Sequence, residues 1–211
     1  DGDKKAAVKD LEQIGPVLAD LQERMFAGAY TDTSNHRVLV VLQGMDTAGK
    51  GGIVNHSMAL LNPNAIHLKS FKKPTPEELS HDFLWRLDQA LPAPGIVGVF
   101  DRSHYEDVLV ARVHQLAPPA ELERRYDAIN EWEQRLVDSG CVIVKCMLHI
   151  SAETQWERLL ARLDDPTKQW KFKPGDIDER AFWEQYQEAY EIALSRCSTP
   201  AAPWHVIPSD H

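Results

Sequence analysis

Residues 38–57 have the sequence "VLVVLQGMDTAGKGGIVNHS", in which a run of β-branched and leucine side chains leads directly into glycines and one lysine. A continuous apolar run of this kind is typical of a strand buried on both faces, as in a parallel sheet. Within the segment, "GMDTAGKG" fits G-x-x-x-x-G-K, a pattern whose backbone N–H groups cradle phosphate at the start of a helix. Glycine is needed there because the backbone must come close to the ligand. The segment therefore predicts a phosphate-binding loop between a buried strand and a helix.

The rest of the chain predicts strands that alternate with helices. Strands are expected at 37–43, 65–71, 95–101 and 141–150, with a last short strand in "WHVIP". Helices are expected at 5–30 with Pro16 as a kink or restart, near His104, and at 51–61, 75–91, 118–139, 152–163 and 178–195. Such alternation predicts an α/β fold with a doubly wound parallel sheet. Because no repeat, second domain or low-complexity segment is visible, we expect residues 1–211 to form a single domain.

Composition narrows the range of partners. The formal net charge is −9, from 32 acidic and 23 basic residues, which argues against a general nucleic-acid binder. A local cluster of lysines and arginines could still attract a polyanion. No apolar run approaches the ~20 residues of a membrane span. Three cysteines make no disulfide framework, so we expect a cytoplasmic protein with no membrane partner.

Two further expectations concern the cysteines and the chain ends. Cys141 and Cys146 lie an odd number of residues apart in one predicted strand, so their side chains should face opposite sides of the sheet. The chain begins at Asp1 without methionine and ends abruptly in "IPSDH". We therefore expect the true start to be missing or processed, and a terminal helix to be missing.

Two aspartates are the candidate metal ligands. The Ser or Thr that commonly follows the lysine of such a loop, and whose hydroxyl holds Mg²⁺, is replaced here by Gly51. Asp46 lies inside the loop, where a carboxylate would repel phosphate unless a cation lay between them. Asp101 ends the predicted strand 95–101, and ligand sites of open α/β sheets lie at that edge. We therefore expect Asp46 and Asp101 to form a metal site.

Basic residues elsewhere suggest phosphoryl transfer. "DRSHYED" supplies Arg102, which could clamp a transferring phosphoryl group, and Glu106. We expect a mobile lid over about residues 152–178, because "ERLLARLDDPTKQWKFKPGD" is rich in basic and aromatic side chains. Arg158 and Arg162 are spaced i, i+4 and share one helix face.

Two classes of P-loop protein compete for this pattern. A regulatory nucleotide switch of the GTPase kind needs an Asn-Lys-x-Asp segment after a late strand, but "HISAETQ" stands there. A phosphotransferase needs a basic lid that excludes water from the phosphates, and the chain offers one. The pattern therefore favours a kinase. An ATP-dependent kinase of a small metabolite or nucleotide remains the main alternative, and a non-catalytic switch the weaker one.

Four ordered motifs resemble the polyphosphate kinase 2 family: "GMDTAGKGG", "SFKKPTPEELSHDFLWR", "FDRSHYEDVLVARVH" and "RLDDPTKQWKF". The resemblance runs from about Leu39 to the end of the chain. It implies a thymidylate-kinase-like P-loop fold with a helical lid. It also implies Mg²⁺-dependent transfer of a terminal phosphoryl group from inorganic polyphosphate to a nucleotide. The glycine after the lysine is then a family trait.

The resemblance implies roles for individual residues. Asp46 and Asp101 would hold Mg²⁺, and Lys50 would grip phosphate. Arg102 and Arg162 would neutralise charge in the transition state of an in-line transfer. The residues expected to bind phosphate or nucleotide are Gly44, Met45, Thr47, Ala48, Gly49, Gly51, Gly52, Lys69, Lys72, Glu106 and Arg158.

The same resemblance bears on substrates and assembly. "SHYED" is similar to the subgroup that phosphorylates both nucleoside mono- and diphosphates, with Glu106 in place of an asparagine of the diphosphate-only subgroup. Lys69, Lys72 and Lys73 would line the polyphosphate path. The resemblance also implies a homo-oligomer, a dimer or tetramer. Base preference and polyphosphate length are left open.

Overall fold

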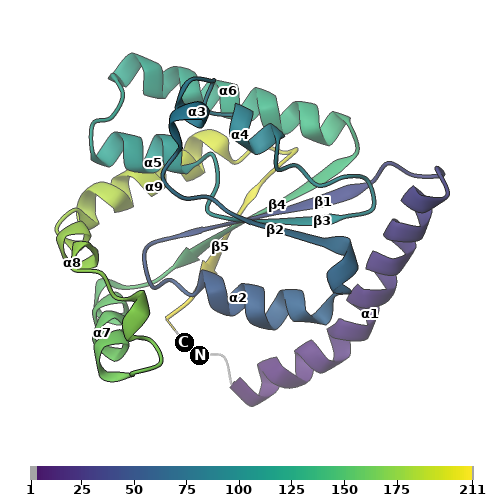
Figure 1. Cartoon of the computed structure of the whole chain (residues 1–211), viewed down its shortest axis with the longest axis horizontal. Helices are drawn as coiled ribbons and strands as arrows, with labels where there is room; N and C mark the ends of the chain where they lie inside the picture. Colours follow the sequence, from purple (N-terminus) through teal and green to yellow (C-terminus); the bar gives the residue numbers. More distant parts are fainter. Residues whose placement is uncertain (1–3, 211) are drawn as a thin grey trace.

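A computed structural model describes residues 4–210 of the chain and contains a five-stranded, wholly parallel sheet (Figure 1). The strand order is β2–β3–β1–β4–β5. The strands are β1 Arg37–Gly44, β2 Ile66–Ser70, β3 Val97–Asp101, β4 Cys141–His149 and β5 Trp204–Pro208. Because parallel neighbours need crossover connections, helices separate the strands along the chain and lie on both faces of the sheet. The predicted doubly wound parallel sheet is confirmed.

The α-helices are α1 Lys4–Tyr30, α2 Lys50–Ser57, α3 Pro76–Leu79, α4 Trp85–Asp88, α5 Glu106–Val113, α6 Pro119–Asp138, α7 Ala152–Asp164, α8 Gly175–Arg180 and α9 Trp183–Cys197. Short 3₁₀ helices occupy Met58–Leu60, Pro63–Ala65 and Gln169–Lys171. In Figure 1, α1 and α2 lie on one side of the sheet and α5, α6 and α9 on the other, while α7 and α8 lie near the carboxyl ends of the strands. Among the described residues, no helix is long and apolar enough to cross a membrane.

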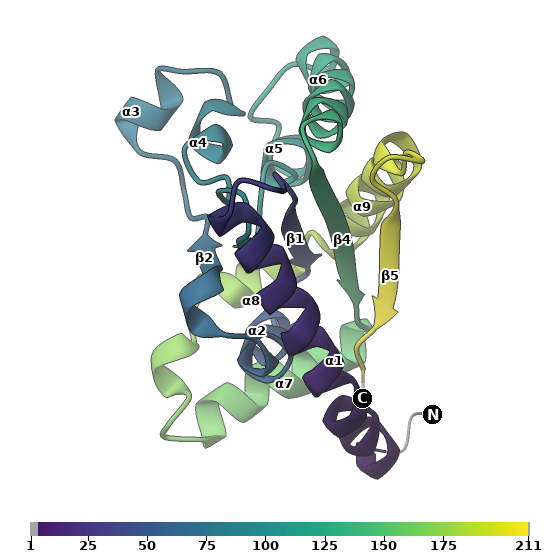
Figure 2. The same ribbon diagram turned by 90° about the vertical axis from the view of Figure 1, so that its right-hand side faces the viewer.

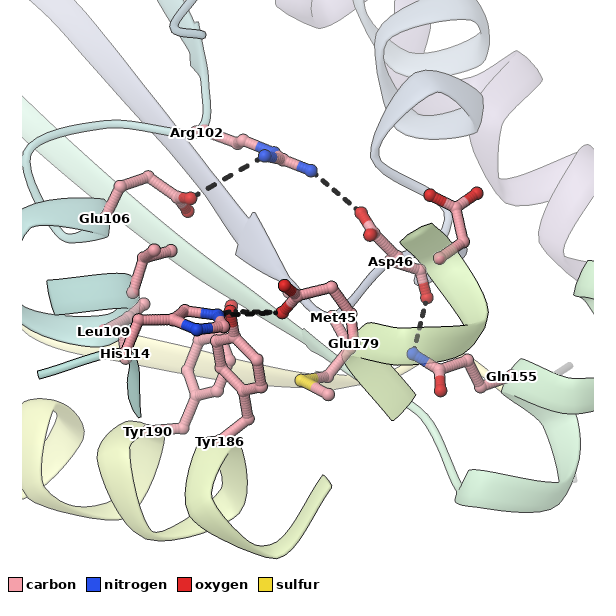
Figure 3. A pocket seen from close by; sticks show the side chains of 13 residues that line it. Met45, Asp46, Arg102, Glu106, Leu109, His114, Gln155, Glu179, Tyr186 and Tyr190 are labelled. Carbon is pink, nitrogen blue, oxygen red and sulfur yellow. Dashed lines mark hydrogen bonds and ion pairs between the residues drawn. The ribbon is translucent and has the colours of Figure 1, made fainter. Parts of the chain in front are cut away.

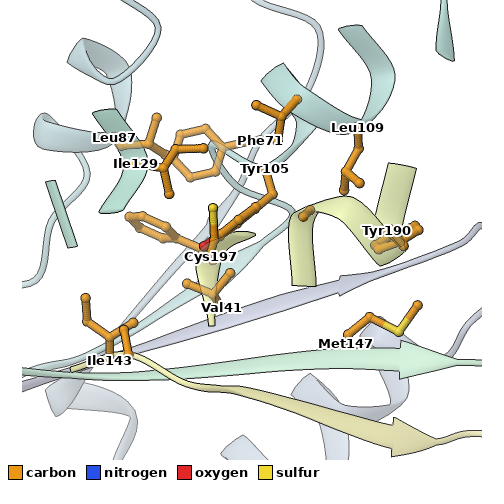
Figure 4. Packing of buried hydrophobic residues seen from close by; sticks show 14 of the residues in the cluster. Val41, Phe71, Leu87, Tyr105, Leu109, Ile129, Ile143, Met147, Tyr190 and Cys197 are labelled. Atoms are coloured by element: carbon orange, nitrogen blue, oxygen red, sulfur yellow. The ribbon is translucent and has the colours of Figure 1, made fainter. Parts of the chain in front are cut away.

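The strands are apolar on both faces because each face is covered. Leu39 and Val41 of β1 belong to the larger core cluster, to which α5, α6 and α9 also contribute residues. Figure 4 shows part of this cluster, including Val41. Leu42 belongs to the second cluster, packed against α1 and α2. The two cysteines of β4 divide in the same way: Cys141 lies in the first cluster and Cys146 packs against the second. The prediction that they face opposite sides is confirmed.

Three predicted helices differ from those observed. The segment 75–91 is broken into α3 and α4, although Thr75 and Glu78 form a full capping box at its start. The break follows from local hydrogen bonds: the Ser80 hydroxyl donates to the carbonyl of Glu77, and the Asp82 carboxylate accepts from the amide of Leu84. Such side-chain bonds offer the backbone an alternative to the helix.

The other differences lie after the glycine loop and before the last strand. The predicted helix 51–61 is α2 followed by a 3₁₀ turn, so the α-helix itself ends at Ser57. The predicted helix 178–195 is α8 and α9, separated at Ala181 and Phe182. The first helix runs through Pro16 without a restart.

Candidate active site

The parallel register places three chain segments at one edge of the sheet. Leu42 of β1 aligns with Asp101 of β3, and Asp101 aligns in turn with Ser70 of β2. The glycine loop that follows β1, the "DRSHYED" segment that follows β3 and the lysines that follow β2 therefore emerge side by side. This is the edge at which open α/β sheets bind ligands.

Glycine in the loop after β1 is required by its backbone. Gly49 has φ 104°, in the left-handed region that side chains with a Cβ rarely adopt. A Cβ on Gly44 would lie 2.7 Å from the carbonyl oxygen of Leu148. At Gly51 and Gly52 a Cβ would meet no heavy atom within 4 Å, so both glycines border open space. The loop is thus a tight turn with an open side at the start of α2.

Lys50, the lysine of the motif, is folded back over this loop. Its Nζ donates to the carbonyl oxygens of Gly44 at 2.7 Å and Met45 at 3.3 Å. Burial, helped by the nearby Arg102 guanidinium, lowers the pKa of Lys50 from its ordinary value of 10.5. The ammonium lies among the carboxylates of Asp46, Asp101 and Glu106, which raise that pKa in part. The lysine therefore lies at the charged centre of the site.

Arg102 links the glycine loop to the segment after β3 (Figure 3). Its Nη2 donates to Asp46 Oδ1 at 2.8 Å, and its Nη1 lies 3.7 Å from Glu106 Oε2. The backbone of Arg102 has φ 63°, an uncommon conformation for a residue with a Cβ. Arg102, Asp46 and Glu106 line a cavity of about 260 Å³ together with Gly44 and Met45. Two residues predicted from distant motifs thus meet across one cavity.

Glu106 also bonds to the buried side chain of Gln43. With its amide nitrogen facing Glu106, the Gln43 side chain donates to Oε1 at 3.0 Å and accepts from the Ser103 hydroxyl at 3.1 Å. Gln43 and Ser103 are fully buried. Burial raises the pKa of Glu106 from its ordinary value of 4.5, although Arg102 and Lys50 oppose that rise.

Asp101 lies beside the loop with one carboxylate oxygen unused. Its Oδ2 accepts a hydrogen bond from the Ser70 hydroxyl at 3.3 Å. Its Oδ1 is buried and has no hydrogen-bond partner in the described structure, and the same holds for the hydroxyl of Thr47 in the glycine loop. A buried oxygen without a hydrogen-bond partner costs free energy. A bound ion would supply the missing partner.

The oxygens of Asp46 and Asp101 fit a hard cation such as Mg²⁺, which prefers oxygen ligands. Within residues 4–210, no group of three or more His, Cys, Asp or Glu side chains forms a ready metal cage. Mg²⁺ sites in phosphotransferases commonly use only one or two carboxylates, with substrate phosphates and waters as the other ligands. The donor set is therefore adequate for Mg²⁺.

The far wall of the cavity was not predicted from the sequence. Glu179 of α8 lies 3.1 Å from His114 Nε2 and accepts a hydrogen bond from the Tyr186 hydroxyl at 2.9 Å, so it links α5 and α9 (Figure 3). Tyr190 lines the cavity beside them. Burial, followed by the bond to Glu179, raises the pKa of Tyr186, which therefore stays a neutral donor. Nothing in the spacing of these residues signals that they meet.

The first half of α7 is attached to the glycine loop. Gln155 donates to the carbonyl of Asp46 at 3.2 Å, and Arg158 Nη1 donates to the carbonyl of Thr47 at 2.9 Å. Arg158 Nη2 also bonds to the carbonyl of Ser209, next to the end of the chain. Arg158 thus lies at the loop, with its guanidinium bonded to backbone oxygens.

Arg162 is not brought to the loop. It lies one turn further along α7, where Nη1 donates to Asp176 Oδ2 at 3.1 Å and to the carbonyl of Lys171 at 3.4 Å. Lys69 and Lys72 are exposed beside the site and do not line the cavity. The Lys69 ammonium lies 5.8 Å from the centre of the Phe71 ring, and the carbonyl of Lys72 accepts from Arg86.

A glycine loop between β1 and α2, faced by an aspartate and an arginine at the end of β3, defines a P-loop kinase fold, as the sequence predicted. The chain belongs to the family described as Polyphosphate kinase 2 (PPK2), whose sequence profile it matches over residues 2–211.

Individual relatives agree with that membership. The chain is 45% identical over 210 residues to the "AMP/ADP-polyphosphate phosphotransferase" of Meiothermus ruber, a match that covers 100% of this chain and 77% of the relative. It is 42% identical over 205 residues to the "ADP-polyphosphate phosphotransferase" of Rhodopseudomonas palustris, with 92% and 69% covered. The crystal structure of polyphosphate kinase 2 from Arthrobacter aurescens TC1 superposes with a TM-score of 0.96 at 52% identity, covering 100% of this chain and 74% of that one.

Proposed function

We propose that this protein is a polyphosphate:nucleotide phosphotransferase, which moves a terminal phosphoryl group between inorganic polyphosphate and AMP or ADP. One observation carries the proposal: Asp46 of the glycine loop and Arg102 of the strand-end segment meet across one cavity. This occurs in a chain that is 45% identical to an AMP/ADP-polyphosphate phosphotransferase over its whole length. The absence of any base-reading Asn-Lys-x-Asp segment in the printed sequence weighs against a regulatory switch.

We propose Mg²⁺ as the cofactor, held by Asp46 and Asp101. The unpartnered Oδ1 of Asp101 supports this assignment, because this buried oxygen could coordinate a bound cation. When bound, Mg²⁺ would neutralise charge on the phosphate oxygens.

The protein side of the mechanism is positioning and electrostatics. The loop borders open space at Gly51 and Gly52, where phosphate oxygens could approach the start of α2. Lys50 would leave the carbonyls of Gly44 and Met45 to bind a phosphate oxygen. Arg102, which bridges Asp46 and Glu106, would donate to the phosphoryl oxygens as charge develops in the transition state. No covalent intermediate is needed for in-line transfer.

We propose that Arg162 reaches the phosphates only after its bond to Asp176 is exchanged. The lid is then the distal part of the predicted segment, residues 162–176, because Gln155 and Arg158 already attach the first half of α7 to the loop. Closure over the cavity would exclude water and protect the phosphoryl group from hydrolysis.

The test of this function is a transfer assay with purified protein. With polyphosphate as the sole donor and Mg²⁺ present, we expect ADP to become ATP and AMP to become ADP, and we expect transfer to stop when Mg²⁺ is chelated. If the protein consumes ATP on a small metabolite while polyphosphate stays inert, the alternative of an ATP-dependent metabolite kinase replaces the proposal. A homo-oligomer, dimer or tetramer, stays a prediction, and sedimentation of the same sample tests it.

A further inference from the structure

A cluster of polar side chains is fully buried beneath the segment that carries Arg102. Lys145 of β4 and Glu133 of α6 are 0% and 1% exposed, and Lys145 Nζ lies 2.6 Å from Glu133 Oε2. The same Nζ donates to the Tyr105 hydroxyl at 2.9 Å and to the carbonyl of Cys197, the last residue of α9, at 2.6 Å. The three protons of this ammonium thus all have partners. Figure 4 shows Tyr105 and Cys197 close together in the core that surrounds this cluster.

The second oxygen of Glu133 bonds to the segment after β3. Its Oε1 accepts from the Tyr105 hydroxyl at 2.8 Å and lies 3.3 Å from His104 Nε2. Burial lowers the pKa of His104, so the ring is neutral, and we assign its proton to Nε2 because Glu133 can only accept. Within the part of the chain that the structure describes, the Glu133 carboxylate therefore bonds to Lys145 and to two residues between Arg102 and Glu106.

Stability alone is a weak reason for such a cluster. Removing a lysine and a glutamate from water costs more than their attraction commonly returns, and apolar residues of similar volume often replace a buried pair without loss. The cluster does, however, fix a short segment in place. His104 and Tyr105 lie between Arg102 and Glu106, and both of those flanking residues line the cavity.

The backbone at Arg102 needs that support. Its φ of 63° is a conformation that costs an L-residue energy, and strain of this kind persists only where the surrounding structure holds it. This conformation accompanies an arginine whose guanidinium reaches Asp46 at 2.8 Å. The bonds of His104 and Tyr105 to Glu133 anchor the chain two and three residues beyond the strained position.

We propose that Tyr105, Glu133 and Lys145 are positioning residues for phosphoryl transfer, which hold the 101–106 segment so that Arg102 and Glu106 face the cavity. The inference rests on the proposed function for its catalytic consequence. Its structural part, that the cluster fixes this segment, holds for the free protein and can be tested without substrate.

The gentlest perturbation is Tyr105→Phe, which removes one hydroxyl and keeps the ring and the ion pair. We expect kcat for ADP with polyphosphate to fall about tenfold, since small misplacements of a charged group have large effects on rate, while KM for ADP changes less than about threefold. Gln22→Leu is the matched control. Gln22 is likewise a buried side chain with hydrogen bonds, in its case to the carbonyls of Asn62 and Ala65, but it lies on α1. We expect this control to keep its kcat.

A double-mutant cycle separates positioning from general damage. If Tyr105 acts through Arg102, Tyr105→Phe should lower kcat in the wild-type background and change it less than about twofold in an Arg102→Ala background. Equal fold losses in both backgrounds, or an unchanged kcat in Tyr105→Phe, would overturn the inference.

Hydrogen exchange of the ligand-free protein gives the second measurement. We expect backbone amides in 102–106 to exchange at least about fivefold faster in Tyr105→Phe, and in Glu133→Gln with Lys145→Met, than in wild type or Gln22→Leu. Unchanged exchange in that segment would show that the cluster does not hold it. A wild-type protein without polyphosphate activity would refute the proposed function, and the exchange comparison would still decide whether the cluster positions the segment.

Discussion

Replacing Asp46 by asparagine should damage chemistry far more than folding. The substitution keeps the size of the side chain and removes its charge. In the structure that charge pairs with Arg102 at 2.8 Å, and the two side chains are 35% and 40% exposed. Ion pairs exposed to this extent contribute about 0.2–1 kcal/mol, so the free energy of unfolding should fall by less than about 1 kcal/mol.

The expected loss in rate is larger. Under the proposed mechanism Asp46 holds Mg²⁺ and also orients Arg102, and both act on charge that develops in the transition state. Removing one such group typically lowers kcat by about 10²-fold or more, which corresponds to about 2.7 kcal/mol at 1.36 kcal/mol per factor of ten. The Mg²⁺ concentration that gives half-maximal rate should also rise, because one carboxylate ligand is gone.

The assay is transfer from polyphosphate to ADP across a Mg²⁺ titration, with urea unfolding of the same samples. Asp127→Asn is the matched control, since Asp127 of α6 forms an exposed ion pair with Arg196 of α9 at 3.5 Å. We expect that variant to keep both its rate and its stability. If Asp46→Asn retains kcat within about threefold with an unchanged Mg²⁺ requirement, the account of how this loop binds metal without a hydroxyl is wrong.

Three further predictions follow from the same site. Burial lowers the pKa of Lys50, so between that lowered value and 10.5 the unfolded chain binds more protons. The free energy of unfolding of wild type, relative to that of Lys50→Met, should therefore rise with pH across this window, and this gain should be lost as pH falls through the lowered pKa. Urea unfolding of both proteins at several pH values measures it, and the same pH dependence in both would contradict the prediction. Glu106→Asn should lower kcat/KM for AMP at least tenfold more than for ADP, because a carboxylate near the shorter acceptor can orient a bound Mg²⁺ ion. Product formation from each acceptor measures this, and equal losses would show that Glu106 does not select the acceptor. Hydrogen exchange over 164–176 should slow when polyphosphate and nucleotide bind, and no change would leave this segment a solvated loop.

Local patterns were sufficient for much of the fold. The apolar run before Gly44, the glycine loop and Asp101 at a strand end could all be predicted, because strand period and turn chemistry depend on neighbouring residues. The same reasoning failed between Ser80 and Leu84, where two side chains satisfy the backbone and break a helix that the apolar spacing favours. Periodicity reports which face is apolar, and it does not report such competing hydrogen bonds.

The sequence alone therefore determined the class of site, since a phosphate loop and a strand-end aspartate are each encoded within a few residues. Only the tertiary structure decided which charges meet. Arg102 pairs with Asp46, 56 residues away, and Arg162 bonds to Asp176 instead of the loop. Lys145, which as sequence only interrupts an apolar strand, proved to be the centre of a buried cluster. The physical reason is that a buried charge must find its partners in space, and burial and partner distance arise from packing between elements far apart in the chain.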